Sequence, residues 1–157
     1  MKKYLLAFIV MVTMTAFSNA QDYSTGIGLR GGLANGITIK HFIGGNSALE
    51  GIVTTRWQGF NITGLYELHS MQVFDVNRLN FYYGLGGHIG FYNGTYTSWG
   101  TVGTSYTVIG VDGILGLEYN FVEVPINLSV DWKPALNLIG NTEFWPDDGA
   151  FSVRYIF

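Results

Sequence analysis

Large apolar side chains recur at every second position along the stretch Gly149–Phe157. Its large apolar members share one face of an extended chain: Phe151, Val153, Tyr155 and Phe157. Its small and polar members share the other face: Ala150, Ser152 and Arg154. A period of two is typical of a β-strand whose two faces meet different environments. The stretch is therefore predicted to be a strand with one apolar face.

Seven more segments have the composition of strands and are separated by turn residues. We expect the eight strands at Tyr23–Leu33, Ile37–Ile43, Ala48–Trp57, Phe60–Ser70, Leu79–Tyr92, Tyr106–Phe121, Ile126–Leu138 and Gly149–Phe157. The tightest turn is predicted at Ala34–Gly36, because Asn-Gly is the strongest short hairpin signal. Longer connections are expected at Met71–Arg78, Asn93–Ser105 and Gly140–Asp148. No helical period appears after residue 20, so the sequence predicts an all-β fold, an eight-stranded antiparallel up-and-down barrel.

Alternation alone does not say which face of the barrel wall points inward. A soluble barrel has its apolar face inside, whereas a transmembrane β-barrel has it outside against lipid. The positions of glycine help to decide, since Gly84 and Gly86 share a face with Tyr82 and His88. Glycine weakens a strand on an outer wall, but inside a narrow barrel it leaves room for long side chains. The face that carries glycine and polar side chains is therefore predicted to line the lumen.

Charged side chains of both signs gather on this same face. Together with one histidine they form a predicted lumen charge network of Arg30, Lys40, Glu50, Arg56, Glu67, His88, Asp112, Glu118, Asp131, Lys133 and Arg154. The five cationic and five anionic groups can pair within one lumen, and buried charges persist only when they are paired. If this face were instead a solvated outer face, nothing would require equal numbers of cationic and anionic groups on it.

Strand length and composition also fit a membrane wall. About nine residues at roughly 3.3 Å each, tilted by about 40°, span roughly 23 Å, close to the apolar band of an outer-membrane barrel. Only 12% of the residues are charged, whereas soluble domains average about 25%. Aromatic residues near the expected strand ends would form interfacial girdles: Trp57, Phe60, Phe91, Tyr119, Phe121, Tyr155 and Phe157.

The start of the chain has the composition of a secretory signal peptide. Met1–Lys3 is basic, Tyr4–Phe17 is apolar, and small residues precede Gln21. A transmembrane helix needs about 20 apolar residues, and this run has 14. We expect residues 1–20 to be a signal peptide cleaved after Ala20, so that residues 21–157 form one outer-membrane β-barrel domain.

Several short segments resemble those of a known family. They are Gly28–Gly32, Gly36–Phe42, Gly84–His88, Gly110–Tyr119 and Asp131–Pro134. Nearly the whole mature chain resembles the Bacteroidota-type small outer-membrane β-barrel family, which implies a barrel in a Gram-negative outer membrane without established catalytic residues. The last strand also resembles the terminal strand of outer-membrane barrels. That resemblance implies that Tyr155 and Phe157 belong to the signal read by the barrel-assembly machinery.

Histidine placement argues against catalysis. Barrels that resemble lipid A palmitoyltransferase or deacylase use a histidine near the outer leaflet, and catalysis needs a base within hydrogen-bond reach of a nucleophile. We expect His41 and His69 at the periplasmic end, and His88 beside Asp112 in a structural contact. The acidic connection Gly140–Asp148 is expected to be solvated rather than to bind a cation. The sequence therefore predicts no catalytic, cofactor-binding or metal site.

Three functions remain open. The first is a structural or surface-interaction barrel filled by its own side chains, as eight strands allow. The second is a porin-like transport barrel for small hydrophobic molecules, similar to outer-membrane protein W-like barrels, and the third is a lipid A-modifying enzyme. We favour the first, as a monomer in contact with outer-membrane lipid and lipopolysaccharide, with Asn93–Ser105 and Gly140–Asp148 outside the cell. The eight Lys and Arg residues are scattered, so no nucleic-acid partner is expected.

Overall fold

The computed structural model describes residues 23–70, 76–121 and 123–157, and the predicted signal peptide lies outside these residues. The strands are β1 Thr25–Gly32, β2 Asn35–Gly44, β3 Ser47–Arg56, β4 Gly59–Ser70, β5 Leu79–Asn93, β6 Ser105–Asn120, β7 Ile126–Trp132, β8 Ala135–Ile139, β9 Phe144–Trp145 and β10 Gly149–Ile156. The 3-10 turn η2, Gly94–Tyr96, follows β5. Within the described residues, no helix is both long and apolar enough to cross a membrane.

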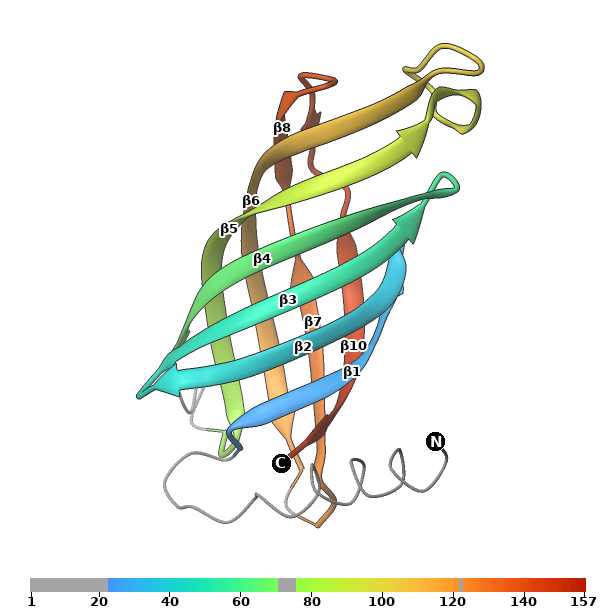
Figure 1. Ribbon diagram of the computed structural model, residues 1–157. Helices are drawn as coiled ribbons and strands as arrows, with labels where there is room; N and C mark the ends of the chain where they lie inside the picture. The colour runs from blue at the N-terminus through green and yellow to red at the C-terminus, as the bar shows by residue number, and fades with distance from the viewer. Residues whose placement is uncertain (1–22, 71–75, 122) are drawn as a thin grey trace, which may run out of the picture.

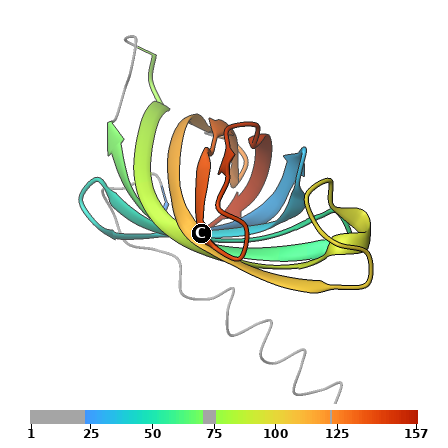
Figure 2. The same cartoon turned by 90° about the horizontal axis from the view of Figure 1, so that it is seen from above.

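The strands form one closed, antiparallel barrel (Figures 1 and 2). The sheet order is β5-β4-β3-β2-β1-β10-β7-β6-β8-β9, and an additional pairing of β5 with β6 closes the ring. Strands β7 and β8 follow each other along β6, so they are two parts of one wall strand. Likewise, β10 pairs with β7 and β9 pairs with β8, so β9 and β10 are two parts of the next wall strand. The predicted eight-stranded antiparallel barrel is therefore confirmed.

The two ends of the barrel differ. The lower end in Figure 1 carries the start of β1, the end of β10 and the tight turn Gly45–Asn46. The upper end carries the turn Trp57–Gln58 and the two long connections 94–104 and 140–148. Both long connections thus lie at the same end, as the up-and-down order of the strands requires.

The predicted Asn-Gly turn was wrong in its position. The chain turns at Leu33–Ala34, and Asn35 and Gly36 already belong to β2. The Asn35 side chain accepts a hydrogen bond of 3.2 Å from the Gly32 backbone N–H. Glycine is needed at position 36 for another reason: a Cβ there would lie 1.9 Å from a backbone oxygen of β3.

The turn with left-handed backbone lies instead between β3 and β4. Trp57 has φ 50° and Gln58 has φ 54°. Two positive φ angles suit the right-handed twist of a tight hairpin, but they are strained for residues with a Cβ. The strained turn fixes Trp57 at the upper end of the barrel.

The seventh wall strand, predicted to be continuous over Ile126–Leu138, is interrupted. It ends as β7 at Trp132 and restarts as β8 at Ala135, because Pro134 has no N–H for the strand ladder. The Trp132 indole N–H donates a 2.5 Å hydrogen bond to the Pro146 carbonyl, in the neighbouring wall strand. Part of the predicted loop Gly140–Asp148 also forms the two-residue strand β9.

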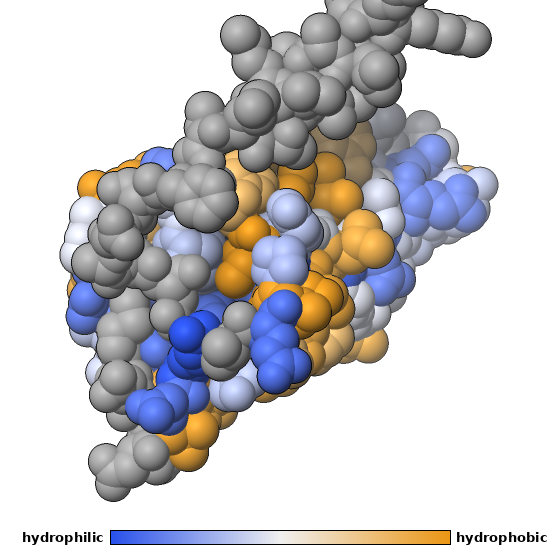
Figure 3. All heavy atoms as spheres, turned by 90° about the horizontal axis from the view of Figure 1, so that it is seen from below, coloured by the Kyte–Doolittle hydropathy of each residue, from blue (hydrophilic) through white to orange (hydrophobic). Residues whose placement is uncertain are grey.

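The distribution of apolar and charged residues is the reverse of that in a soluble protein. Apolar side chains lie on the outer wall, and charged side chains lie inside. Along the outer wall, Leu29 is 70% exposed and Leu85 is 76% exposed. Inside, Lys40 and Arg154 have no exposed surface. Figure 3, which views the molecule from below, shows apolar residues along much of the visible wall. The face that carries the charges therefore lines the lumen.

Among the described residues, buried apolar side chains form two small groups inside the barrel. The first lies at the lower end and consists of Tyr23, Phe42, Ala48 and Ile156. The second lies further up and consists of Ile52, Leu65, Tyr82 and Ile114. The rings of Tyr23 and Phe42 meet edge to face at 5.1 Å, and they form an apolar floor. Most of the remaining interior is polar.

Candidate functional site

The lumen is lined by charged residues that the two-residue period of the strands directs inward. Every member of the predicted network except Arg56 is buried in the lumen: Arg30, Lys40, Glu50, Glu67, His88, Asp112, Glu118, Asp131, Lys133 and Arg154. Arg56 lies at the upper end, where its side chain is 19% exposed. The charges fall into a lower cluster, a central pair and an upper cluster.

The lower cluster is organised around Lys40, and we define it as Lys40, Glu50, Glu67, His69, Glu118 and Arg154. The Lys40 ammonium lies 2.8 Å from Glu67 and 3.5 Å from both Glu50 and Glu118. It also lies 3.9 Å above the ring of Tyr82. One fully buried ammonium thus faces three carboxylates and an aromatic ring, which together replace its hydration.

Arg154 supplies the second cation of the lower cluster. Its guanidinium pairs with Glu50, and Thr38 also donates a hydrogen bond to that carboxylate. Further guanidinium N–H groups donate to Asn127 at 3.0 Å and to Ser129 at 2.7 Å. A buried guanidinium is tolerated when its donors find acceptors in this way.

His69 completes the lower cluster, although the sequence prediction gave it no role. Its Nε2 lies 3.1 Å from Glu67 and its Nδ1 lies 3.3 Å from Glu118. The imidazole of His69 thus lies between two carboxylates of the lower cluster. The available signal was the spacing of two from Glu67, which puts both side chains on the same face.

The central pair joins Arg30 of β1 to Asp131 of β7. Two guanidinium nitrogens lie 2.7 and 2.8 Å from the two carboxylate oxygens. The Tyr82 hydroxyl donates to the same carboxylate at 3.1 Å. The contact through Arg30 Nη1 is a charge-assisted hydrogen bond, which is stronger than a hydrogen bond between neutral groups.

The upper cluster consists of His88, Asp112, Lys133 and Asp148. Lys133 lies 3.0 Å from Asp112 and 3.0 Å from Asp148. His88 contacts Asp112 through Nδ1 at 2.7 Å and the Asn137 amide through Nε2 at 2.9 Å. The connection Gly140–Asp148 was predicted to be solvated, but its last residue, Asp148, is buried. This end of the connection is therefore part of the lumen.

An aromatic cluster covers the upper cluster, and we call it the aromatic mouth: Trp57, Tyr92, Trp99 and Trp145. The Trp145 ring lies 5.4 Å from Trp57, 5.9 Å from Tyr92 and 6.3 Å from Trp99. It also stacks 6.5 Å from His88 below it. The aromatic mouth therefore joins the turn between β3 and β4, strand β5, the connection 94–104 and strand β9.

Arg56 holds one side of the mouth. Its guanidinium lies 4.0 Å above the Trp57 ring and 2.6 Å from Asp147. The hydrogen bonds from Arg56 lower the pKa of the Asp147 carboxyl. Asp147 was predicted to be solvated, and its side chain is indeed 48% exposed, although the ion pair ties the connection 140–148 to the β3–β4 turn.

The arrangement contains no recognisable catalytic constellation among the described residues. Both ring nitrogens of His88 face Asp112 and Asn137 rather than a hydroxyl. His41 is exposed at the lower end, where it contacts the Thr25 hydroxyl at 2.8 Å. No group of three His, Asp or Glu side chains in the described part of the chain could hold a metal ion.

Tyr155 and Phe157, which resemble the assembly signal of outer-membrane barrels, lie at the lower end. Tyr155 points outward and is 54% exposed, and its ring lies 6.1 Å from that of Phe157. The Phe157 carbonyl accepts a 2.9 Å hydrogen bond from the Thr25 N–H. Both residues are thus held against β1 at the closing seam of the barrel.

Comparison with known proteins does not extend this description. The sequence matches no protein-family model, and no curated protein matches it either.

Proposed function

We propose that this chain is an integral β-barrel of a bacterial outer membrane, with a lumen filled by its own side chains and a structural or surface-interaction role. The observation that carries the proposal is the inverted wall, with leucines exposed outside and lysines and arginines buried inside. In water such an outer surface would be unfavourable, since soluble monomers rarely expose large contiguous apolar patches. In hydrocarbon it is the favourable arrangement.

The closed sheet supports the same proposal. Backbone N–H and C=O groups have no water to bind inside a bilayer, so only helices and closed barrels satisfy them. Here β5 pairs with β6, and this pairing closes the ring of strands. The resemblance to the Bacteroidota-type small barrels agrees with this location. Contacts with outer-membrane lipid, lipopolysaccharide and the barrel-assembly machinery follow from it, and we propose a monomer.

The alternative functions receive less support. Transport of a small hydrophobic molecule needs an open or apolar lumen, whereas this one holds Lys40, Arg30 and their partners. A lipid A-modifying enzyme needs a nucleophile beside its base, and His88 contacts an acid and an amide instead. We therefore propose a protein that is neither a transporter nor an enzyme.

The location can be tested with spin labels, because the chain contains no cysteine. Leu85→Cys and Val130→Cys place a label on the outer wall, and Val102→Cys places one in the connection 94–104. In outer-membrane vesicles the two wall labels should be accessible to oxygen and shielded from a water-soluble nickel chelate. The label at Val102 should show the opposite preference. Equal exposure of all three labels to the chelate would refute the membrane location.

A further inference from the structure

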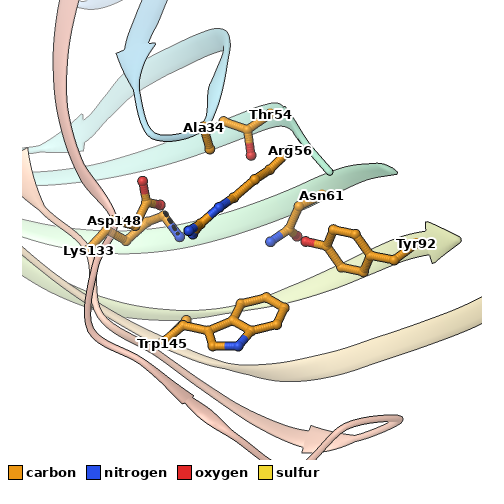
Figure 4. Close-up of a pocket in the computed structure, with 9 residues that line it drawn as sticks. Ala34, Thr54, Arg56, Asn61, Tyr92, Lys133, Trp145 and Asp148 are labelled. Atoms are coloured by element: carbon orange, nitrogen blue, oxygen red, sulfur yellow. Dashed lines mark ion pairs between the residues drawn. The ribbon is translucent and has the colours of Figure 1, made fainter. Parts of the chain in front are cut away.

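One side-chain oxygen at the upper end of the lumen lacks a hydrogen-bond partner within the described residues. Asn61 of β4 is only 9% exposed, and its Oδ1 has no hydrogen-bond partner within the described residues. It borders a cavity of about 20 Å³ that Arg56, Tyr92, Lys133 and Trp145 also line (Figure 4). A buried amide oxygen without a partner is costly, so the site points to a ligand that supplies one.

The charges around the cavity indicate a neutral ligand. Arg56 pairs with Asp147, and Lys133 pairs with Asp112 and Asp148. An ionic ligand would have to compete with one of these pairs. A hydroxyl group would not, and it can both donate and accept. It therefore suits Asn61 whichever way the amide is turned.

The aromatic mouth adds a second requirement. Trp145 lines the cavity, Trp57 and Trp99 pack beside Trp145, and all three are partly exposed. The Trp99 indole N–H is a buried donor without an acceptor in the described part of the chain. Aromatic faces bind apolar surface, while their polar edges bind hydroxyls. A ligand that meets both needs has a C–H face and several hydroxyl groups, as a sugar ring does.

We propose that the aromatic mouth binds the neutral end of a saccharide. The enclosed space of about 20 Å³ admits one group of the size of a water molecule. One hydroxyl or hydroxymethyl group enters beside Asn61, and the ring lies outside it against the indoles. The strained backbone at Trp57 and Gln58 agrees with this, because strain of this kind concentrates at ligand-binding sites.

The proposal rests on the proposed function only for the source of the sugar, which would be a glycan at the cell surface. Binding itself can be tested on the folded barrel in detergent. Methyl α-mannoside, maltose and lactose are titrated while the indole N–H signals are followed by NMR. Signals of Trp99 and Trp145 should shift and saturate. The signal of Trp132, on the outer wall, should stay in place. Glycerol, which has hydroxyls but no ring face, should cause no saturable shift.

Asn61→Leu should weaken the apparent affinity about tenfold, the value of one lost hydrogen bond of roughly 1.4 kcal/mol. The matched control is Asn46→Leu, in the exposed turn at the opposite end, which should leave binding unchanged. If Asn61→Leu does not fold, the side-chain amide signal of Asn61 in the unmodified protein should shift with the sugar instead. An Asn61 amide that contacts only water, or the absence of saturable shifts with all three sugars, overturns the proposal. Neither result bears on the spin-label test of membrane location.

Discussion

At the scale of single residues, each buried charge in the lumen has few alternative partners of opposite charge. Asp131 accepts hydrogen bonds from Arg30 Nη1 and from the Tyr82 hydroxyl, and its other carboxylate oxygen lies 2.7 Å from Arg30 Nη2. Without Asp131, the nearest remaining carboxylate to the Arg30 guanidinium is that of Asp148, at 4.0 Å. Removing one partner from a buried pair leaves an uncompensated charge, which costs more than the pair itself contributes.

We therefore predict that Asp131→Leu lowers the free energy of unfolding by about 3–5 kcal/mol. The matched control is Glu123→Leu, in the exposed turn before β7, which should change it by less than about 0.5 kcal/mol. Urea unfolding of the barrel in lipid, followed by circular dichroism, measures both. The double variant Arg30→Met/Asp131→Leu should recover much of the loss, because it removes both charges. Equal destabilisation by Asp131→Leu and Glu123→Leu would mean that Asp131 is not part of a buried pair.

At the scale of strands, inward glycines have two distinct uses. A Cβ at Gly116 would lie 2.4 Å from the Tyr82 ring, and one at Gly90 would lie 2.6 Å from the Tyr92 ring. These two make room for long side chains, as the sequence argument required. At Gly36 a Cβ would instead meet a carbonyl oxygen of the next strand. The backbones of β2 and β3 approach each other too closely there for any side chain.

Two glycine-to-alanine substitutions separate these effects. Gly36→Ala should destabilise the barrel by about 2–3 kcal/mol, since the new Cβ must displace backbone. Gly64→Ala makes the same chemical change on the outer face, where an added Cβ meets nothing within 4 Å. It should be neutral or slightly stabilising. Thermal unfolding of both variants in the same detergent measures the difference, and a Gly36→Ala barrel as stable as Gly64→Ala would contradict the close approach.

The strands themselves could be predicted from the period of two, but their interruptions could not. Pro134 is a visible break, yet the wall continues past it because β8 pairs again with β6. The strand β9 has only two residues, too few to show any period. Its position depends on the pairing with β8 and on the bond from Trp132 to Pro146, which joins residues 14 apart. Such contacts are set by the closed barrel rather than by the local sequence.

At the scale of the whole molecule, the obstruction of the lumen is distributed along its length. The floor of Tyr23 and Phe42, the lower cluster, the Arg30–Asp131 pair and the aromatic mouth follow one another from end to end. The sequence predicted most of the charges that line the lumen, but not Asp148 or His69. It could not predict which of them pair, because Arg30 and Asp131 lie on β1 and β7, with β10 between them.

We predict no steady conductance for the purified barrel in planar lipid bilayers. Trp145→Ala removes the centre of the aromatic mouth and should remain equally silent, because the layers below it are intact. Single-channel recordings of both proteins provide the measurement. Uniform current steps from the unmodified protein would favour transport. Steps that appear only in Trp145→Ala would identify the mouth as a gate above an open lumen.

The pairing of distant charges also constrains the order of assembly. Arg30 meets Asp131 across 101 positions of sequence, and Arg154 meets Glu50 across 104. A half-finished sheet would present these guanidinium groups without their counter-ions, a state that hydrocarbon excludes. These two ion pairs form only when the first and last strands meet. For a chain that enters a bilayer, ring closure and the departure from water are then coupled into a single step, and no open-sheet intermediate survives within the lipid.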